Sequence, residues 1–240
     1  MRLTIGYRGT AFAGWGLQPR QRTVQAALES ALEQVLGHPT RATAAGRTDA
    51  GVHADAQVVS LSTASAIPAA ALASALAHAL PSDVWVVDAC EAPPGFDARR
   101  NATRRWYRYH VWRGDVPKAA WQGRCLAYSD PLNVPDMRRA AQTILGRHDF
   151  RGYASPPEGR STVRTVFASD VLEQGPLLTY EVCADGFLTH MVRGIVGGLL
   201  WVGRGRWTAE QFASALTTTD RRDAGPNAPP VGLTLARIDY

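Results

Sequence analysis

Residues 44–54 read AAGRTDAGVHA and form the most informative stretch of the sequence. Two glycines, Gly46 and Gly51, bracket an Arg-Thr-Asp triplet, so the backbone can turn sharply and hold Arg47 and Asp49 beside each other. A carboxylate beside a fixed guanidinium stays ionised and could act as a nucleophile, a base or the stabiliser of a cation. The alternative is an Asx turn, in which Asp49 only accepts hydrogen bonds from backbone amides.

Outward from this stretch, helical and strand-like patterns alternate along the chain. Apolar spacing, caps and Pro or Gly boundaries predict helices over 24–36, 68–80, 137–145 and 187–202, and one that follows a capping box at Thr208. Strand-like patterns cover 3–7, 57–61, 84–87, 106–112, 162–172, 177–184 and 233–238. Turns such as 173–176 are too short for a parallel crossover, so we expect an α+β protein with mixed, largely antiparallel sheets.

The stretch 91–105 is rich in Pro, Gly and Arg and separates a first set of elements from a second. We therefore expect two subdomains, an N-terminal one over 1–100 that carries the Asp49 motif and a C-terminal one over 101–240.

Charge and cysteine content narrow the class of protein. The formal net charge is +5, and Lys118 is the only lysine among 26 basic residues. An arginine-dominated charge favours a nucleic-acid or phosphorylated partner, although an arginine-rich genome would leave the same composition. Three widely spaced cysteines signal neither a disulfide framework nor a zinc site, and there is no secretion signal or bilayer-length apolar run. We expect a cytoplasmic protein without a metal.

Residues 46–53, GRTDAGVH, resemble the catalytic motif of the tRNA pseudouridine synthase A family residue for residue. The similarity extends over nearly the whole chain, through the segments 7–15, 23–25, 96–99, 105–109, 146–150 and 187–197. Two departures are Gly16-Leu17-Gln18, where the family usually has Gln-x-Gln, and Asp97, where His is common. Both departures bear on substrate fit more than on catalysis.

The resemblance implies the pseudouridine synthase fold, with two α+β subdomains around a basic central cleft. It also implies isomerisation of uridine to pseudouridine at positions 38, 39 and 40 of the tRNA anticodon arm, without a cofactor. Asp49 would attack C1′ of the sugar, deprotonate C2′ or add to C6 of the uracil, and the sequence does not choose among these routes. The implied partners are the anticodon arm and a second copy of the chain in a homodimer.

The same resemblance assigns the other candidate site residues. Arg193, which interrupts an apolar helix, is the candidate ion-pair partner of Asp49; its alternative is a surface arginine, although an unpaired charge there would be costly. Tyr107 would stack on the uracil and reach C5, while either it or Tyr109 could be ordinary packing. Arg47, Arg105 and Arg108 would contact RNA around a flipped nucleotide, while Arg105 and Arg108 could instead simply keep one face of a sheet solvated.

Three histidines inside the motifs, His53, His148 and His190, share no ligand spacing and are interpreted as packing or hydrogen-bonding residues. Asp149 and Phe150 are interpreted as structural. Two rival functions stay open: a tRNA-binding module without chemistry, and a nucleosidase-like hydrolase in which Asp49 stabilises a cation and free uracil is released.

Overall fold

The computed structural model describes residues 1–155, 159, 161–218, 220 and 224–240, and the chain divides into two compact units. Unit 1 contains residues 1–103 together with 234–240, and unit 2 contains residues 104–233. The chain thus leaves unit 1 once and returns to it with its last strand.

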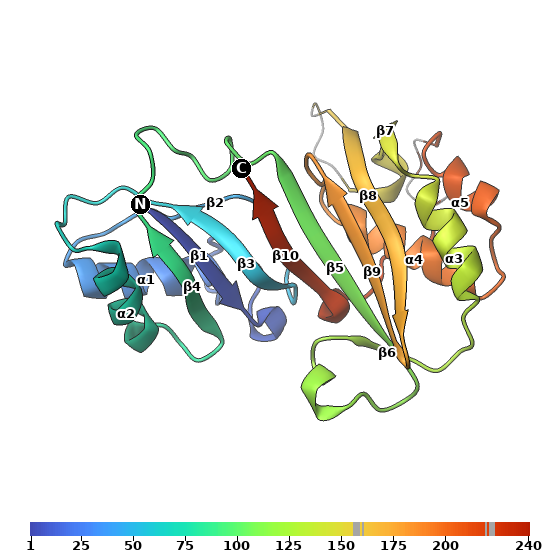
Figure 1. Ribbon diagram of the computed structural model, residues 1–240, viewed down its shortest axis with the longest axis horizontal. Coiled ribbons are helices and arrows are strands. Elements are labelled where there is room, and N and C mark those ends of the chain that lie inside the picture. The colour runs from blue at the N-terminus through green and yellow to red at the C-terminus, as the bar shows by residue number, and fades with distance from the viewer. Residues whose placement is uncertain (156–158, 160, 219, 221–223) are drawn as a thin grey trace. The chain divides into compact units, whose positions relative to one another are not determined.

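Unit 1 contains five strands with mixed parallel and antiparallel pairing, shown in Figure 1. Its strands are β1 (Arg2–Tyr7), β2 (Thr43–Ala44), β3 (His53–Ser60), β4 (Val84–Cys90) and β10 (Leu233–Asp239). The order is β4-β1-β3-β10, with β2 paired to β3. β1 is antiparallel to both of its neighbours, whereas β10 runs parallel to β3.

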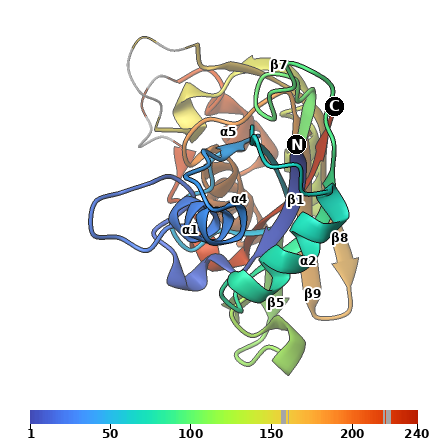
Figure 2. The same cartoon turned by 90° about the vertical axis from the view of Figure 1, so that its left-hand side faces the viewer.

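Two helices complete unit 1, α1 (Val24–Leu36) and α2 (Ala69–Ala79). The predicted α1 is confirmed with its caps: Thr23 Oγ1 accepts a hydrogen bond from the Ala26 amide, and Gly37 ends the helix at φ +75°. The helices pack against each other, as Figure 2 shows, and α2 also contacts β4. Alternate residues of β1 and the apolar stripes of both helices supply fully buried side chains: Leu3, Ile5, Leu28, Leu32, Leu72 and Leu76.

Unit 2 combines a largely antiparallel sheet with three helices. Its strands are β5 (Arg104–Arg113), β6 (Leu126–Tyr128), β7 (Gly146–Asp149), β8 (Val163–Gln174) and β9 (Leu177–Ala184). The order is β5-β9-β8-β7, and the short β6 lies parallel to β5. The predicted hairpin is confirmed, because β8 and β9 are antiparallel across a turn that has Gly175 at φ +60°.

The helices of unit 2 are α3 (Val134–Gln142), α4 (Met191–Gly203) and α5 (Ala209–Ser214), which pack against one another. Both hydrogen bonds of the predicted capping box are present at the start of α5. α4 begins four residues later than predicted, because His190 adopts a left-handed conformation with φ +64° that a helix cannot contain. α3 ends at Gln142, so Ile144 is buried outside the helix.

Helices and mixed, largely antiparallel sheets confirm the predicted α+β class. Within the described ranges, no helix combines the length and the apolar character that a bilayer crossing requires.

Candidate active site

Asp49 lies on the loop that joins β2 to β3. The Thr48 side chain is buried, that of Asp49 is partly buried and that of Arg47 is exposed. Asp49 O accepts a hydrogen bond from the Val52 amide at 3.2 Å, and Gly51 has φ +79°. Of the two glycines that predict the sharp turn, Gly51 supplies the left-handed conformation and Gly46 does not, and the turn directs the chain into β3.

Two buried polar side chains lie beneath this loop. The Tyr7 hydroxyl, from the end of β1, is 2.8 Å from Thr48 Oγ1. Gln57, on β3, donates from Nε2 to Gly46 O at 2.7 Å and to the Tyr7 hydroxyl at 3.4 Å. The loop is therefore tied from below to both strands on which it rests.

The segment 9–15 holds the same loop from the side. The Trp15 amide donates to Thr48 O at 3.0 Å, and the Gly51 amide donates to Phe12 O at 3.2 Å. The Gly9 amide donates to His53 Nδ1 at 3.2 Å, which makes buried His53 a hydrogen-bond acceptor here, in line with its predicted role. These contacts fix the backbone on both sides of Asp49.

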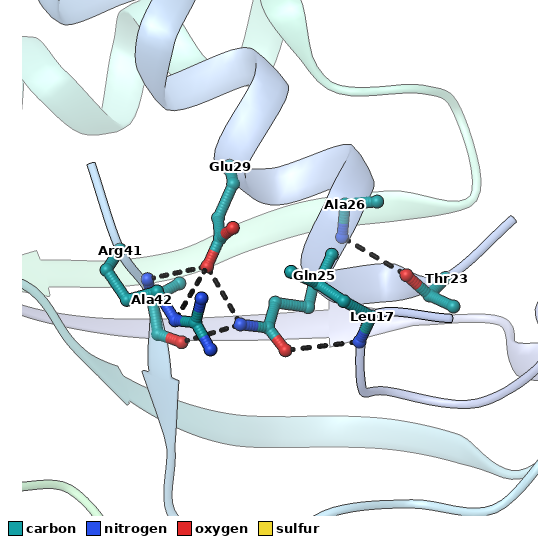
Figure 3. A network of polar contacts seen from close by, with 7 residues as sticks. All are labelled: Leu17, Thr23, Gln25, Ala26, Glu29, Arg41 and Ala42. Carbon is teal, nitrogen blue, oxygen red and sulfur yellow. Dashed lines mark hydrogen bonds and ion pairs between the residues drawn. The ribbon is translucent and has the colours of Figure 1, made fainter. Parts of the chain in front are cut away.

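Helix α1 anchors the segment 9–17 in turn. The Val24 and Gln25 amides at its first turn donate to Gly14 O and Trp15 O, at 3.1 and 3.0 Å. Figure 3 shows the Gln25 side chain accepting from the Leu17 amide while donating to Ala42 O and to Glu29 Oε1. Gln25 thus joins the helix to the segment before it and to the segment that leads into β2.

The two departures from the family pattern lie in different local surroundings. Gly16 lies beside Arg47, because a Cβ added at Gly16 would be 3.8 Å from Arg47 Nε. Asp97 Oδ1 accepts from the Arg100 and Arg99 amides at 2.9 and 2.8 Å, and these bonds hold the pKa of Asp97 below its usual value. Asp97 therefore closes a turn.

In unit 2, Tyr107 lies on β5 with 8% of its surface exposed, and its ring meets Phe187 edge-on at a centroid distance of 5.0 Å. Tyr109, two residues along, is fully buried and donates from its hydroxyl to Pro229 O at 2.8 Å. Of the two tyrosines, Tyr109 is therefore the one with a packing role. Phe187 precedes α4 instead of lying within it.

Arg193 lies in the first turn of α4 and is partly buried. Its Nε donates to Ala228 O at 2.8 Å, and its own carbonyl accepts from the Ala228 amide at 2.9 Å. The backbone also packs closely here, since a Cβ on Gly197 would lie 1.7 Å from Pro226 O. The buried charge has a polar partner, as its position in an apolar helix requires.

The two arginines of β5 predicted to contact RNA both have acceptors within unit 2. Arg108 Nε lies 2.6 Å from Glu181 Oε2 on the neighbouring strand, and Arg105 donates to Asp185 O at 2.7 Å. Because Glu181 compensates the charge of Arg108, that guanidinium is a weaker phosphate ligand than its sequence position indicates.

Sequence reasoning missed Tyr7, Trp15 and Gln57 as supports of the Asp49 loop. Gln57 did carry a signal, since it directly precedes the apolar pair Val58 and Val59 in the predicted strand. Within the described ranges, no group of three or more His, Cys, Asp or Glu side chains is placed to hold a metal ion.

Comparison with known proteins gives the family. The family model described as tRNA pseudouridine synthase matches residues 4–99 and 140–240. The chain is 41% identical over 243 residues to the tRNA pseudouridine synthase A of Moorella thermoacetica, with 100% of this chain and 99% of that protein covered. It is 42% identical over 241 residues to the protein of the same name from Methylobacterium nodulans, with 100% and 95% covered.

Among solved structures, "Crystal Structure of a Cbf5-Nop10-Gar1 Complex" aligns with 85% of this chain and 55% of that chain, at 14% identity and a TM-score of 0.33. The family model and the relatives, each matched over most or all of the chain, are decisive: this chain belongs to the tRNA pseudouridine synthase family.

Proposed function

We propose that this chain isomerises uridine to pseudouridine in the anticodon arm of tRNA, at positions 38, 39 and 40. The observation that carries the proposal is the Asp49 loop. Thr48 beside Asp49 is fixed through its hydroxyl and its carbonyl, while the Asp49 side chain stays partly exposed beside the exposed Arg47. A carboxylate held in this way is prepared to meet a reacting sugar.

The reaction rearranges bonds without oxidation or reduction. The C–N glycosidic bond breaks, the uracil turns over, and C5 bonds to the same C1′ before its proton leaves. Asp49 serves as nucleophile or base in this sequence, and a closed pocket would retain the free uracil and exclude water. Since a uridine in a stem cannot present C1′ and C5, the nucleotide is flipped out, at a cost of a few kcal/mol.

The remaining residues take supporting roles in the proposal. Arg193 balances the Asp49 charge, Tyr107 contacts the uracil ring, and Arg47, Arg105 and Arg108 bind the RNA. We further propose that the chain acts in the cytoplasm as a homodimer, because two protomers of formal charge +5 offer RNA a wider positive surface.

The decisive experiment uses tRNA that carries 5-tritiated uridine. The unaltered protein should release tritium, leave the RNA mass unchanged and produce carbodiimide-dependent reverse-transcription stops in the anticodon arm. Asp49→Ala should bind tRNA and release no tritium. The control is Asp88→Asn, which removes an exposed carboxylate of the same unit and should retain the rate.

Each rival function predicts a different readout. A binding module would bind tRNA without tritium release in any variant. A nucleosidase-like hydrolase would liberate free uracil and lower the RNA mass. Tritium release by Asp49→Ala equal to that of the unaltered protein would show that Asp49 is not the reacting carboxylate.

A further inference from the structure

A fully buried phenol lies directly under the residue that precedes Asp49. Tyr7 is 1% exposed, and its hydroxyl meets the buried Thr48 Oγ1 at 2.8 Å. The register of β1 against β3 shifts between Ile5, opposite Gln57, and Tyr7, opposite Ala54. The extra residue lies on β3, between Ala54 and Gln57, and a bulge of this kind bends its strand locally. Here the end of β1 brings its phenol beneath the loop.

Burial determines which form of the phenol is present. Desolvation raises the pKa of Tyr7 to about 12, so the group remains a neutral O–H donor throughout the physiological range. The Tyr7 oxygen also accepts from Gln57 Nε2, and in the bond between Tyr7 and Thr48 either hydroxyl can be the donor. Three side chains from β1, β3 and the loop thus share one ordered set of hydrogen bonds.

The orientation of the Gln57 amide is fixed by the same set. Gly46 O can only accept, so Nε2 and not Oε1 must face it, at 2.7 Å. Gln57 Oε1 is then buried without a hydrogen-bond partner among the described residues. A buried acceptor without a hydrogen bond destabilises the folded state, but this orientation of Gln57 keeps its Nε2 donor beneath the loop.

Thr48 is consequently held twice, by its hydroxyl from below and by its carbonyl from Trp15. Asp49 follows directly, and its own carbonyl accepts from Val52. We propose that Tyr7 is a positioning residue that fixes the Asp49 carboxylate through the Thr48 hydroxyl. The inference rests on the proposed function and adds to it a residue outside the reacting groups.

The test compares Tyr7→Phe, which removes one oxygen atom, with a matched control. Tyr180 is also buried, and its hydroxyl lies 3.0 Å from Ser169 Oγ in unit 2, so Tyr180→Phe removes an equivalent bond away from the Asp49 loop. Single-turnover tritium release, tRNA Kd and Tm are measured for both variants. Thr48→Val and Thr48→Ser test the same bond from its other end.

If Tyr7 positions Asp49, Tyr7→Phe lowers the single-turnover rate constant by about 10- to 100-fold, because small misplacements of reacting groups are that costly. Its tRNA Kd stays unchanged, and Tyr180→Phe retains the rate despite a similar loss of Tm. Thr48→Ser keeps the hydroxyl and most of the rate. The Tyr7→Phe/Thr48→Val double variant is no slower than the slower single variant, since both remove one interaction.

The inference is overturned if Tyr7→Phe slows the reaction no more than Tyr180→Phe does, or if the effects of Tyr7→Phe and Thr48→Val multiply. Should Tyr7→Phe fail to fold, the comparison of Thr48→Val with Thr48→Ser decides in the same way. Failure of the proposed function would give a different experimental result, because the unaltered protein would then release no tritium at all.

Discussion

Substituting Gly9 by alanine should displace the Asp49 loop. An added Cβ would lie 1.9 Å from Val52 O, whereas ordinary contacts begin at 3.4 Å. The Val52 carbonyl belongs to the backbone and must retreat by about 1.5 Å to restore ordinary contact. That movement would lengthen two hydrogen bonds, from the Gly9 amide to His53 Nδ1 and from the Val52 amide to Asp49 O, both now 3.2 Å.

The size of the effect follows from these contacts. Overpacking costs about 1–3 kcal/mol, and each lost hydrogen bond about 0.5–1.5 kcal/mol. The reduced entropy of the unfolded alanine chain returns about 0.4–1 kcal/mol. The net loss is about 3 kcal/mol, a large part of the roughly 5–15 kcal/mol that stabilises most proteins. Because Asp49 moves with the loop, the rate should fall by about 100-fold.

Urea unfolding and single-turnover tritium release measure the two losses separately. Gly46→Ala is the matched control, since no atom lies within 4 Å of the added Cβ and the stability should change by less than about 0.5 kcal/mol. A Gly9→Ala protein with an unchanged urea midpoint and an unchanged rate would refute the steric argument.

Three further changes test other contacts. Asp83→Asn removes the ion-pair partner of Arg22, whose hydrogen bond lowers the pKa of Asp83. The variant should lose about 1 kcal/mol or less of unfolding free energy at pH 7, because the pair is partly exposed, and Tm scans should show this loss vanish as the pH falls below the ordinary value of 3.8. A pH-independent difference in Tm would contradict this prediction. Gln25→Ala should cost about 1–3 kcal/mol in urea unfolding, because it strands buried backbone groups; a loss within error would count against the network. Glu181→Gln should remove the carboxylate that competes with phosphate for Arg108 and steepen the salt dependence of tRNA binding by up to about 0.7–0.9 in log–log slope. An unchanged slope in filter binding would show that Arg108 does not contact phosphate.

Local signals account for the elements that could be predicted. The caps of α1 and α5 lie within a few residues of the helices that they start or end, and the β8–β9 turn lies between its own strands. Such contacts are readable because neighbours in sequence are neighbours in space. The short strands β2, β6 and β7, of two to four residues, carry too few side chains for a periodicity to show.

The parts that escaped prediction depend on an unusual backbone conformation or on distant residues. The start of α4 depends on the left-handed backbone of His190, which no apolar spacing reveals. Tyr7 and Thr48 are 41 positions apart, and Tyr7 and Gln57 are 50 apart, so their hydrogen bonds exist only once the sheet has formed. The motif indicated Asp49 as the candidate group, whereas its supports became visible only in three dimensions.

The return of β10 to unit 1 sets an order of events during synthesis on the ribosome. At about 5–20 residues per second, the 130 residues of unit 2 take roughly 6–26 s to make. Throughout that interval β3 lacks β10, whose Thr234 and Leu235 pair with His53 and Ala54 directly after the Asp49 loop. Nascent chains should therefore expose the β3 edge beside the Asp49 loop for as long as unit 2 is being made, and chains stalled in that interval should be prone to aggregate there.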